Sequence, residues 1–294
     1  MTTAPRNPGP SWGFQFLARA DRILPEVIFR PLCALGTAVA VVGMPVQRAH
    51  SRAYLRALTG REPTWREVFR HFLAFEEFLV LRLRVANGQP HRGDLAPDAS
   101  GFHALLASGE PALLGTFHLG HSDLTGFLLG RQEHRRVFMV RQRVGNSHDT
   151  EVLGEQFGEW VRFIWVNEAS NLLFALKDAV ASGGSVALKC DRLEFSAKTA
   201  AFEFLGRKRL FPFTIYHLAT IFRLPVVLSV GVPAAPGHST VHSSRLFVPD
   251  GGEKAANLAR AHAHFQEFLT RIESMLRADP YLWFNFTPLN PPAP

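Results

Sequence analysis

Apolar runs of strand length alternate with helix-length segments along the chain after residue 101. Several of these runs are too uniformly apolar to form strands with one face in water. Helical patterns lie between them at 122–130, 172–181 and 215–222. Because parallel strands need crossover connections, this alternation predicts an α/β fold with a mostly parallel central sheet flanked by helices. The strand candidates are 112–117, 137–141, 163–166, 186–190 and 225–232.

A helical region is predicted to precede this α/β unit. Thr64 and Glu67 have the spacing of a capping box, and an amphipathic pattern continues from there to about Arg84. We therefore predict a helical, membrane-interface region at 1–90 and an α/β core at 91–294.

Three further segments complete the predicted organisation. The Gly-, Pro- and Asp-rich stretch 87–101 is predicted to be a linker or surface loop. Residues 240–247 are predicted to add an edge strand, and 254–277 carry the apolar stripe of a final amphipathic helix.

An apolar stretch without Asp, Glu, Lys or Arg, 31–47, predicts contact with a membrane. It is shorter than the ~20 residues of a spanning helix, and Pro45 limits its helical continuation. A segment that dips into the membrane interface, or a buried hairpin, fits better, and an ordinary core helix is the alternative. Flanking arginines would face anionic headgroups while their stems cover apolar surface. These are Arg19, Arg22, Arg30, Arg48, Arg52 and Arg56.

The charge balance restricts the partners. The 32 Lys and Arg against 25 Asp and Glu give a formal charge of +7, which favours anionic lipid headgroups or phosphopantetheine carriers. Nucleic acid is not expected, since the chain has no zinc-finger spacing and no basic helix arm. Cys33 and Cys190 form no metal or redox motif, so we expect a reducing compartment and neither a metal nor a disulfide framework.

A histidine and an aspartate stand where the first predicted strand meets its helix. His118 is followed five positions later by Asp123, with a glycine between them. If a helix opens there, its first turn can bring the Asp123 carboxylate back toward His118. The sequence thus predicts a general base with its orienting acid.

The same spacing also occurs elsewhere in the chain. Chance predicts about one such pair at this composition, and His71 with Glu76 and His262 with Glu267 share the separation. Each of these lies inside a helical segment, where residues five apart point in different directions. Only the 118/123 pair lies at a strand-to-helix junction, the usual place for catalytic groups in α/β proteins.

Other motifs follow this pair in an order seen in one family. In that order the chain resembles the lysophospholipid acyltransferase superfamily and, within it, the bacterial lipid A biosynthesis (late) acyltransferases. The resemblance covers nearly the whole chain. The motifs are Asp191-Arg192, Phe204-Leu205-Gly206-Arg207, Phe211-Pro212 and Pro280-Tyr281-Leu282-Trp283.

The resemblance implies an O-acyltransferase that uses the histidine and the acid as its catalytic pair. His118 would deprotonate an acceptor hydroxyl, and Asp123 would orient the ring and stabilise its charged form. The hydroxyl would attack an acyl thioester of acyl carrier protein or coenzyme A, with no further cofactor. A base near pKa 7 suits this step, because a hydroxyl is a poor nucleophile at neutral pH.

The resemblance also implies substrate-binding residues. Arg141, with Arg143 as a close competitor, would hold an oxyanion or a phosphate; a rim arginine in a surface ion pair is the alternative. Asp191 and Arg192 match the family's acidic-then-polar pair at a strand end. A structural role for Asp191, such as capping a turn or pairing with Arg192, is as open as a direct role in catalysis. In the acceptor-side loop, Gly206 would allow close backbone approach and Arg207 would meet an anionic headgroup.

The chain departs from the family pattern at two places. His121 stands where many members have another residue, and it could compete for Asp123 or cap the helix. The segment from Trp283 to Phe286 lacks the basic residues that follow the tryptophan in many lipid A enzymes. This absence favours a relative that acts on another lipid or lipid-linked acceptor, a glycolipid included.

Two other functions remain open from the sequence. A serine hydrolase would use Ser122, although the second glycine of a nucleophile elbow is missing and the residue is better interpreted as a helix N-cap. A catalytically silent relative would bind lipid or carrier protein. Cys190 is a weaker nucleophile candidate, since it ends an apolar strand. The favoured interpretation is a peripheral acyltransferase at the cytoplasmic face of the inner membrane.

Overall fold

The computed structural model describes residues 11–142, 148–167, 171–193, 196 and 198–291. Its strands are β1 (Arg92–Leu95), β2 (Leu113–Gly120), β3 (Val137–Arg141), β4 (Val161–Trp165), β5 (Ser185–Lys189), β6 (Thr199–Phe204), β7 (Arg207–Pro212), β8 (Val226–Pro233) and β9 (His238–Ser243). Its helices are α1 (Ser11–Ile23), α2 (Glu26–Gly43), α3 (Pro45–Thr59), α4 (Trp65–Ala86), α5 (Ser100–Ser108), α6 (Ser122–Gln132), α7 (His148–Phe157), α8 (Leu172–Ala181), α9 (Thr214–Phe222) and α10 (Lys254–Ala278).

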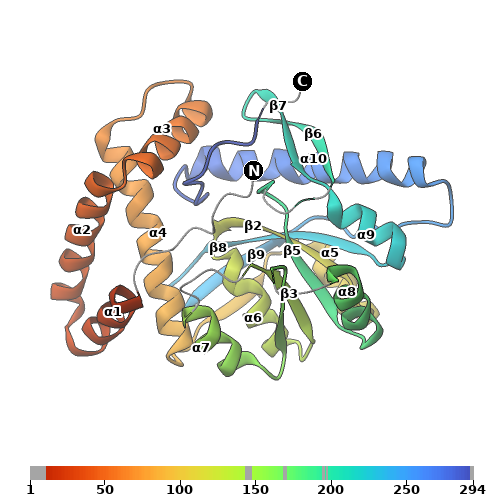
Figure 1. Ribbon diagram of the computed structural model, residues 1–294, viewed down its shortest axis with the longest axis horizontal. Helices are drawn as coiled ribbons and strands as arrows, with labels where there is room; N and C mark the ends of the chain where they lie inside the picture. Colours follow the sequence, from red (N-terminus) through yellow and green to blue (C-terminus); the bar gives the residue numbers. More distant parts are fainter. Residues whose placement is uncertain (1–10, 143–147, 168–170, 194–195, 197, 292–294) are drawn as a thin grey trace.

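In the described residues, a seven-stranded sheet has the order β1-β9-β8-β2-β5-β3-β4 (Figure 1). Every neighbouring pair of these strands is parallel except β8 with β9. The predicted α/β fold with a mostly parallel sheet is therefore confirmed. Strands β2 and β5 are direct neighbours, so their carboxyl ends lie side by side at one edge of the sheet.

Helices cover both faces of the sheet, as the apolar runs predict. Leu113 and Phe117 of β2 belong to a core shared with α8, α9 and α10, whereas Leu114 belongs to a second core shared with α5, α6 and α7. Figure 1 shows α10 crossing one side of the sheet, with α6 and α7 on the other. Successive residues of a strand point to opposite faces, and a strand buried on both faces is apolar at nearly every position.

The N-terminal helices pack beside this sheet, with α4 between α2 and the rest of the molecule (Figure 1). The predicted capping box is present, because the backbone N–H of Thr64 donates to Glu67 Oε2 at 2.7 Å and Thr64 Oγ1 accepts from the Glu67 backbone. Tyr54 of α3 and Phe72 of α4 are buried in the same core as α10. From residue 11 onward the helical character predicted for the N-terminal region is confirmed, and its contact with a membrane stays a prediction.

The uncharged stretch forms most of α2 and the first residues of α3, not a buried hairpin. One side of α2 packs inward through Phe29, Cys33, Thr37 and Val41. The other side is exposed and apolar, with Leu35, Val39 and Val42 each about two-thirds accessible. By length and composition α2 could cross a membrane, and only 22% of its 18 residues are buried.

Two predicted segments differ from the structure. The expected linker 87–101 contains strand β1, whose four residues pair with β9 and include Gly93 and Asp94, so no apolar alternation marks it. Strand β9 is not an edge, because β1 pairs along its outer side.

Strands β6 and β7 form a separate hairpin that the sequence does not predict. Its two-residue turn requires positive φ at Leu205 (53°) and Gly206 (71°), which matches the right-handed twist of the paired strands.

Candidate active site

The junction between β2 and α6 is a tight turn that depends on Gly120. The pairing of β2 with β8 shifts register between Thr116 and Gly120. Gly120 has φ of 50°, and a Cβ there would lie 2.5 Å from the Gly231 carbonyl oxygen. A side chain at this position would force the strand end apart. The turn therefore holds His118 at the end of the sheet.

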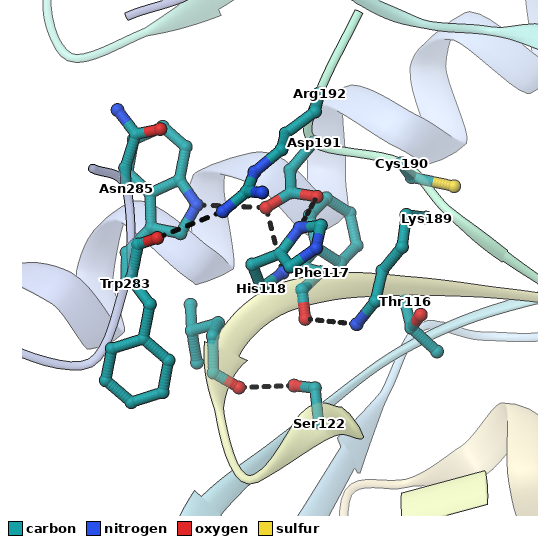
Figure 2. Close-up of polar contacts among 12 residues, drawn as sticks. Thr116, Phe117, His118, Ser122, Lys189, Cys190, Asp191, Arg192, Trp283 and Asn285 are labelled. Atoms are coloured by element: carbon teal, nitrogen blue, oxygen red, sulfur yellow. Dashed lines mark hydrogen bonds and ion pairs between the residues drawn. The ribbon is translucent and has the colours of Figure 1, made fainter. Parts of the chain in front are cut away.

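The imidazole of His118 is hydrogen-bonded to Asp191, the second residue after β5. Thr116 pairs with Lys189 across the two parallel strands, so continuing the register places His118 beside Asp191. His118 Nδ1 lies 2.8 Å from Asp191 Oδ1, and the His118 backbone N–H donates to Oδ2, also at 2.8 Å. Figure 2 shows the imidazole and carboxylate in contact. The side chain of Asp191 is 1% exposed and that of His118 25%.

A C-terminal segment closes the other side of Asp191. Trp283 Nε1 donates to Asp191 Oδ2 at 3.0 Å, and Asn290 donates to the Asp191 backbone carbonyl. The Phe284 backbone N–H donates to the carbonyl oxygen of His118 at 2.9 Å. The closing tryptophan motif, far from His118 in the sequence, thus lies directly on the site.

The environment keeps the imidazole neutral and the carboxylate charged. Burial lowers the pKa of His118, and the positive charges of Arg192 and Lys189 lower it further against the attraction of Asp191. Burial alone would raise the pKa of Asp191, but His118 and its hydrogen bond, with Arg192 and Lys189, outweigh this and hold it well below its usual range. In a neutral ring whose Nδ1–H donates to a carboxylate, Nε2 carries no proton and its lone pair can accept one.

Asp123 does not orient His118, and that prediction is wrong. Its carboxylate forms an ion pair with Lys189 Nζ, and Arg82 and Arg141 nitrogens lie 3.6 and 3.9 Å from its Oδ2. Burial raises the pKa of Asp123, yet these three cations outweigh burial and hold it well below its usual value. These cations attract the Asp123 carboxylate more strongly than His118 does, because the Nδ1–H of His118 already donates to Asp191.

Lys189 and Arg82 are functional candidates that the sequence analysis missed. Lys189 Nζ donates to the Phe117 backbone carbonyl at 3.1 Å (Figure 2). Because it also pairs with Asp123, it connects the strand end of His118 to that carboxylate. Arg82 is nearly buried on α4, four residues after the buried Phe78. A charged residue on the apolar stripe of a helix is the signal that could have identified it.

The other predicted substrate-binding residues are dispersed. Arg141 faces Asp123, and its guanidinium lies over the rings of Phe127 and Phe163. Arg192 donates to the Phe284 carbonyl at 3.2 Å, beside Asp191.

The predicted acceptor-side residues lie in the exposed hairpin turn. Gly206 and Arg207 follow Leu205, whose backbone N–H donates to Glu273 of α10. Among the described contacts, none joins either residue to His118 or Asp191, so their substrate role stays a prediction. Arg143 lies outside the described residues.

The alternative nucleophiles are buried. Ser122 is the first residue of α6 and not its N-cap; its hydroxyl donates to the Leu119 carbonyl at 2.5 Å and accepts from the Gly231 backbone. His121 does not compete for Asp123, because its Nδ1 lies 2.8 Å from the Ser239 hydroxyl. Burial raises the pKa of the Cys190 thiol well above its usual value, and Figure 2 shows this side chain pointing away from His118.

An apolar cavity opens beside the Asp123 cluster, between the sheet and helices α5 and α6. Most of its exposed wall is apolar, and one polar end carries Asp123, Lys189 and Arg141; Glu133 and Arg135 also line it. His118 is adjacent to this end through Lys189 but does not line the cavity. Within the described part of the chain, no group of three His, Cys, Asp or Glu side chains is placed to hold a metal ion. The aliphatic wall includes Leu105, Leu114, Leu129, Val137 and Met139.

No protein-family model and no curated protein matches the chain. Among solved structures, the chain is similar to that of the 1-acyl-sn-glycerophosphate (LPA) acyltransferase, PlsC, from Thermotoga maritima, at 12% sequence identity and a TM-score of 0.41. The match covers 85% of this chain and 98% of that one.

Proposed function

We propose that this protein is an O-acyltransferase that moves a fatty acyl group from an acyl thioester to a hydroxyl of a lipid or lipid-linked acceptor. The donor would be acyl carrier protein or coenzyme A. The observation that carries the proposal is the partly exposed imidazole of His118, held through Nδ1 by the buried carboxylate of Asp191. This arrangement is suited to a general base.

The proposed reaction needs only one residue to move a proton. His118 Nε2 takes the proton of the acceptor hydroxyl as its oxygen attacks the thioester carbonyl. The tetrahedral intermediate then collapses, the C–S bond breaks, and the departing thiolate takes the proton from Nε2. Asp191 would stabilise the imidazolium between these steps, because its carboxylate stays charged and in hydrogen-bond contact.

Asp123 takes a different role in this proposal from the one the sequence predicts. Three cations surround its single carboxylate, so the group retains excess positive charge at the polar end of the cavity. Such charge would stabilise an oxyanion or hold a phosphate of donor or acceptor. Asp123 would fix Lys189 and Arg141 in position, and the aliphatic wall of the cavity would take the acyl chain.

We further propose a peripheral position on the cytoplasmic face of the inner membrane; the exposed apolar side of α2 supports the contact with a membrane. Its apolar residues would enter the lipid while neighbouring arginines contact anionic headgroups. Flotation with phosphatidylglycerol vesicles should recover the protein, and rising salt should reduce the recovery. Equal recovery with neutral vesicles at all salt concentrations would remove the electrostatic part of this proposal.

Acyl transfer can be tested with the purified protein, acyl-carrier and acyl-coenzyme A donors, and a lipid extract. Mass spectrometry should detect a lipid one acyl group heavier, together with release of free thiol. His118→Ala should reduce both by about a thousandfold, as for loss of a general base. His103→Ala, which removes an exposed histidine of α5, is the matched control and should retain full activity.

The other open functions give different results in the same assay. Thiol release without an acylated lipid would indicate a hydrolase. Vesicle or donor binding with no turnover, and no effect of His118→Ala, would indicate a silent relative. Either result would overturn the acyltransferase proposal.

A further inference from the structure

We propose that Trp283 is a positioning residue for His118: its indole N–H fixes the Asp191 carboxylate, and Ser51 and His71 hold Trp283 in place. The kinetic consequence rests on the proposed acyl transfer, whereas the structural consequence can be measured without it. No sequence motif indicates this connection, because its members come from α3, α4, β2, the end of β5 and the C-terminal segment.

The carboxylate of Asp191 has a fixed orientation because its two oxygens have different partners. Oδ2 accepts from the backbone N–H of His118 and from Trp283 Nε1, at 2.8 and 3.0 Å. Oδ1 is left to accept from the imidazole Nδ1. Without the indole donor, Oδ2 would keep only the backbone N–H of His118 as a partner. Trp283 is therefore the side chain that directs Oδ1 toward the ring.

Trp283 is itself held on several sides. Its backbone forms an isolated antiparallel bridge with Leu119, next to His118. Its ring meets Tyr54 and Phe204 edge-on, with ring centroids 5.2 and 5.5 Å apart. Only 4% of the residue is exposed. The indole N–H consequently has little freedom to leave Asp191.

A buried histidine of α4 completes the support. His71 Nε2 lies 2.8 Å from the Trp283 carbonyl oxygen, which can only accept, so Nε2 carries the proton. Nδ1 then accepts from the Ser51 hydroxyl at 2.8 Å. His71 is fully buried, and burial lowers its pKa to about 4. The ring of His71 is thus neutral and in one tautomer near pH 7.

Removing the indole donor while keeping an aromatic ring gives a specific expectation. In Trp283→Phe, Asp191 loses one donor and interacts more strongly with the imidazolium form of His118, so the pKa of His118 rises. The carboxylate also becomes freer to rotate. We expect kcat to fall roughly tenfold, as for loss of an outer hydrogen-bond partner, with KM within twofold. The acid limb of the rate profile should move to higher pH by the same amount as the pKa of His118.

The test is an NMR titration of ¹⁵N-histidine-labelled full-length protein, with the His118 signals assigned by His118→Gln. Trp283→Phe is compared with Trp65→Phe, which removes an exposed tryptophan at the start of α4. The expected result is a higher pKa and a changed Nδ1 signal for His118 in the first variant only. An unchanged titration of His118 in folded Trp283→Phe would overturn the proposal.

A second pair of variants covers the case in which Trp283→Phe does not fold. His71→Leu removes the donor to the Trp283 carbonyl, whereas His71→Gln retains an N–H at about the same reach. His71→Leu should shift the pKa of His118, and His71→Gln should give the wild-type pKa. Equal His118 titrations in the two variants would overturn the proposal.

The two proposals can fail separately in these measurements. A pKa shift in a protein without acyl transfer removes the proposed function and leaves the positioning role. Full acyl transfer with no pKa shift in Trp283→Phe removes the positioning role and leaves the proposed function.

Discussion

Two aspartates lie near the end of β2, Asp191 buried and Asp123 partly buried, and their surroundings differ in kind. Asp191 receives hydrogen bonds from an imidazole, a backbone N–H and an indole. Asp123 is surrounded by Lys189, Arg82 and Arg141. The first set orients a group that can exchange a proton, whereas the second set concentrates positive charge beside an apolar cavity.

The comparison shows that partner geometry, not residue type or local spacing, decides what a carboxylate does. Both groups have a pKa well below the usual range, but for different reasons. Against burial, the low pKa of Asp191 depends first on His118 and its hydrogen bond, whereas that of Asp123 depends first on the charges of Lys189, Arg141 and Arg82. Substitutions at the two positions should therefore have separable effects.

The largest expected effect is that of Asp191→Asn on turnover. The two donors on Oδ2 require an oxygen there, so the amide nitrogen would face His118 Nδ1. Nδ1 would then have to accept, which places the proton on Nε2 and removes the base. We expect kcat/KM to fall by about a thousandfold, measured by thiol release.

Asp178→Asn is the matched control for this substitution, because Asp178 is an exposed carboxylate of α8. It should leave turnover unchanged. If Asp191→Asn retained more than a tenth of wild-type kcat/KM, Asp191 would lose its assigned role as the partner of the imidazole.

The next largest effect is that of Asp123→Asn on stability. Removing one charge would leave Lys189, Arg82 and Arg141 largely buried together without a counterion, which costs about 3 kcal/mol of unfolding free energy. Urea denaturation followed by circular dichroism measures this loss. Turnover should fall less than in Asp191→Asn, because His118 keeps its acceptor.

A paired substitution sharpens this result. Adding Lys189→Met to Asp123→Asn removes one of the uncompensated cations and should recover part of the lost stability. An Asp123→Asn variant with wild-type stability and the same rate–pH change as Asp191→Asn would restore Asp123 as the partner of the imidazole.

Much of the fold follows from local sequence patterns. The strand at 137–141 and the helix at 172–181 have the predicted bounds, because buried parallel strands and amphipathic helices have distinct apolar periods. Strand β1 is missed because Gly93 and Asp94 carry no apolar signal. The hairpin turn is missed because Leu205, a residue without special backbone freedom, adopts positive φ.

The candidate site is only partly predictable for a different reason. The strand-to-helix position of His118 is visible locally, and Asp191 is visible at a strand end. Which acid meets the imidazole depends on the register of β2 with β5, and no local spacing encodes that register. The contact of Trp283 with Asp191 joins positions 92 residues apart.

The smallest expected effect concerns acid and again separates the two regions. His71 supports Trp283 in the Asp191 region, and burial lowers its pKa to about 4 from the ordinary 6.5. The unfolded chain therefore binds a proton at this histidine below pH 6.5 while the folded protein does not. The contribution of His71 to the free energy of unfolding is thus fully present above pH 6.5 and is lost as the pH falls toward 4. Between pH 7 and 5 the contribution lost is about 2 kcal/mol. Urea denaturation at the two pH values should show that His71→Gln, which cannot titrate, loses less stability than the wild type by this amount. The difference should persist in the Asp123→Asn background, because the partners of His71 are Ser51 and Trp283 and not the Asp123 group. An equal acid loss with and without His71 would mean that the imidazole carries a proton inside the fold and does not hold the Trp283 carbonyl in the manner described.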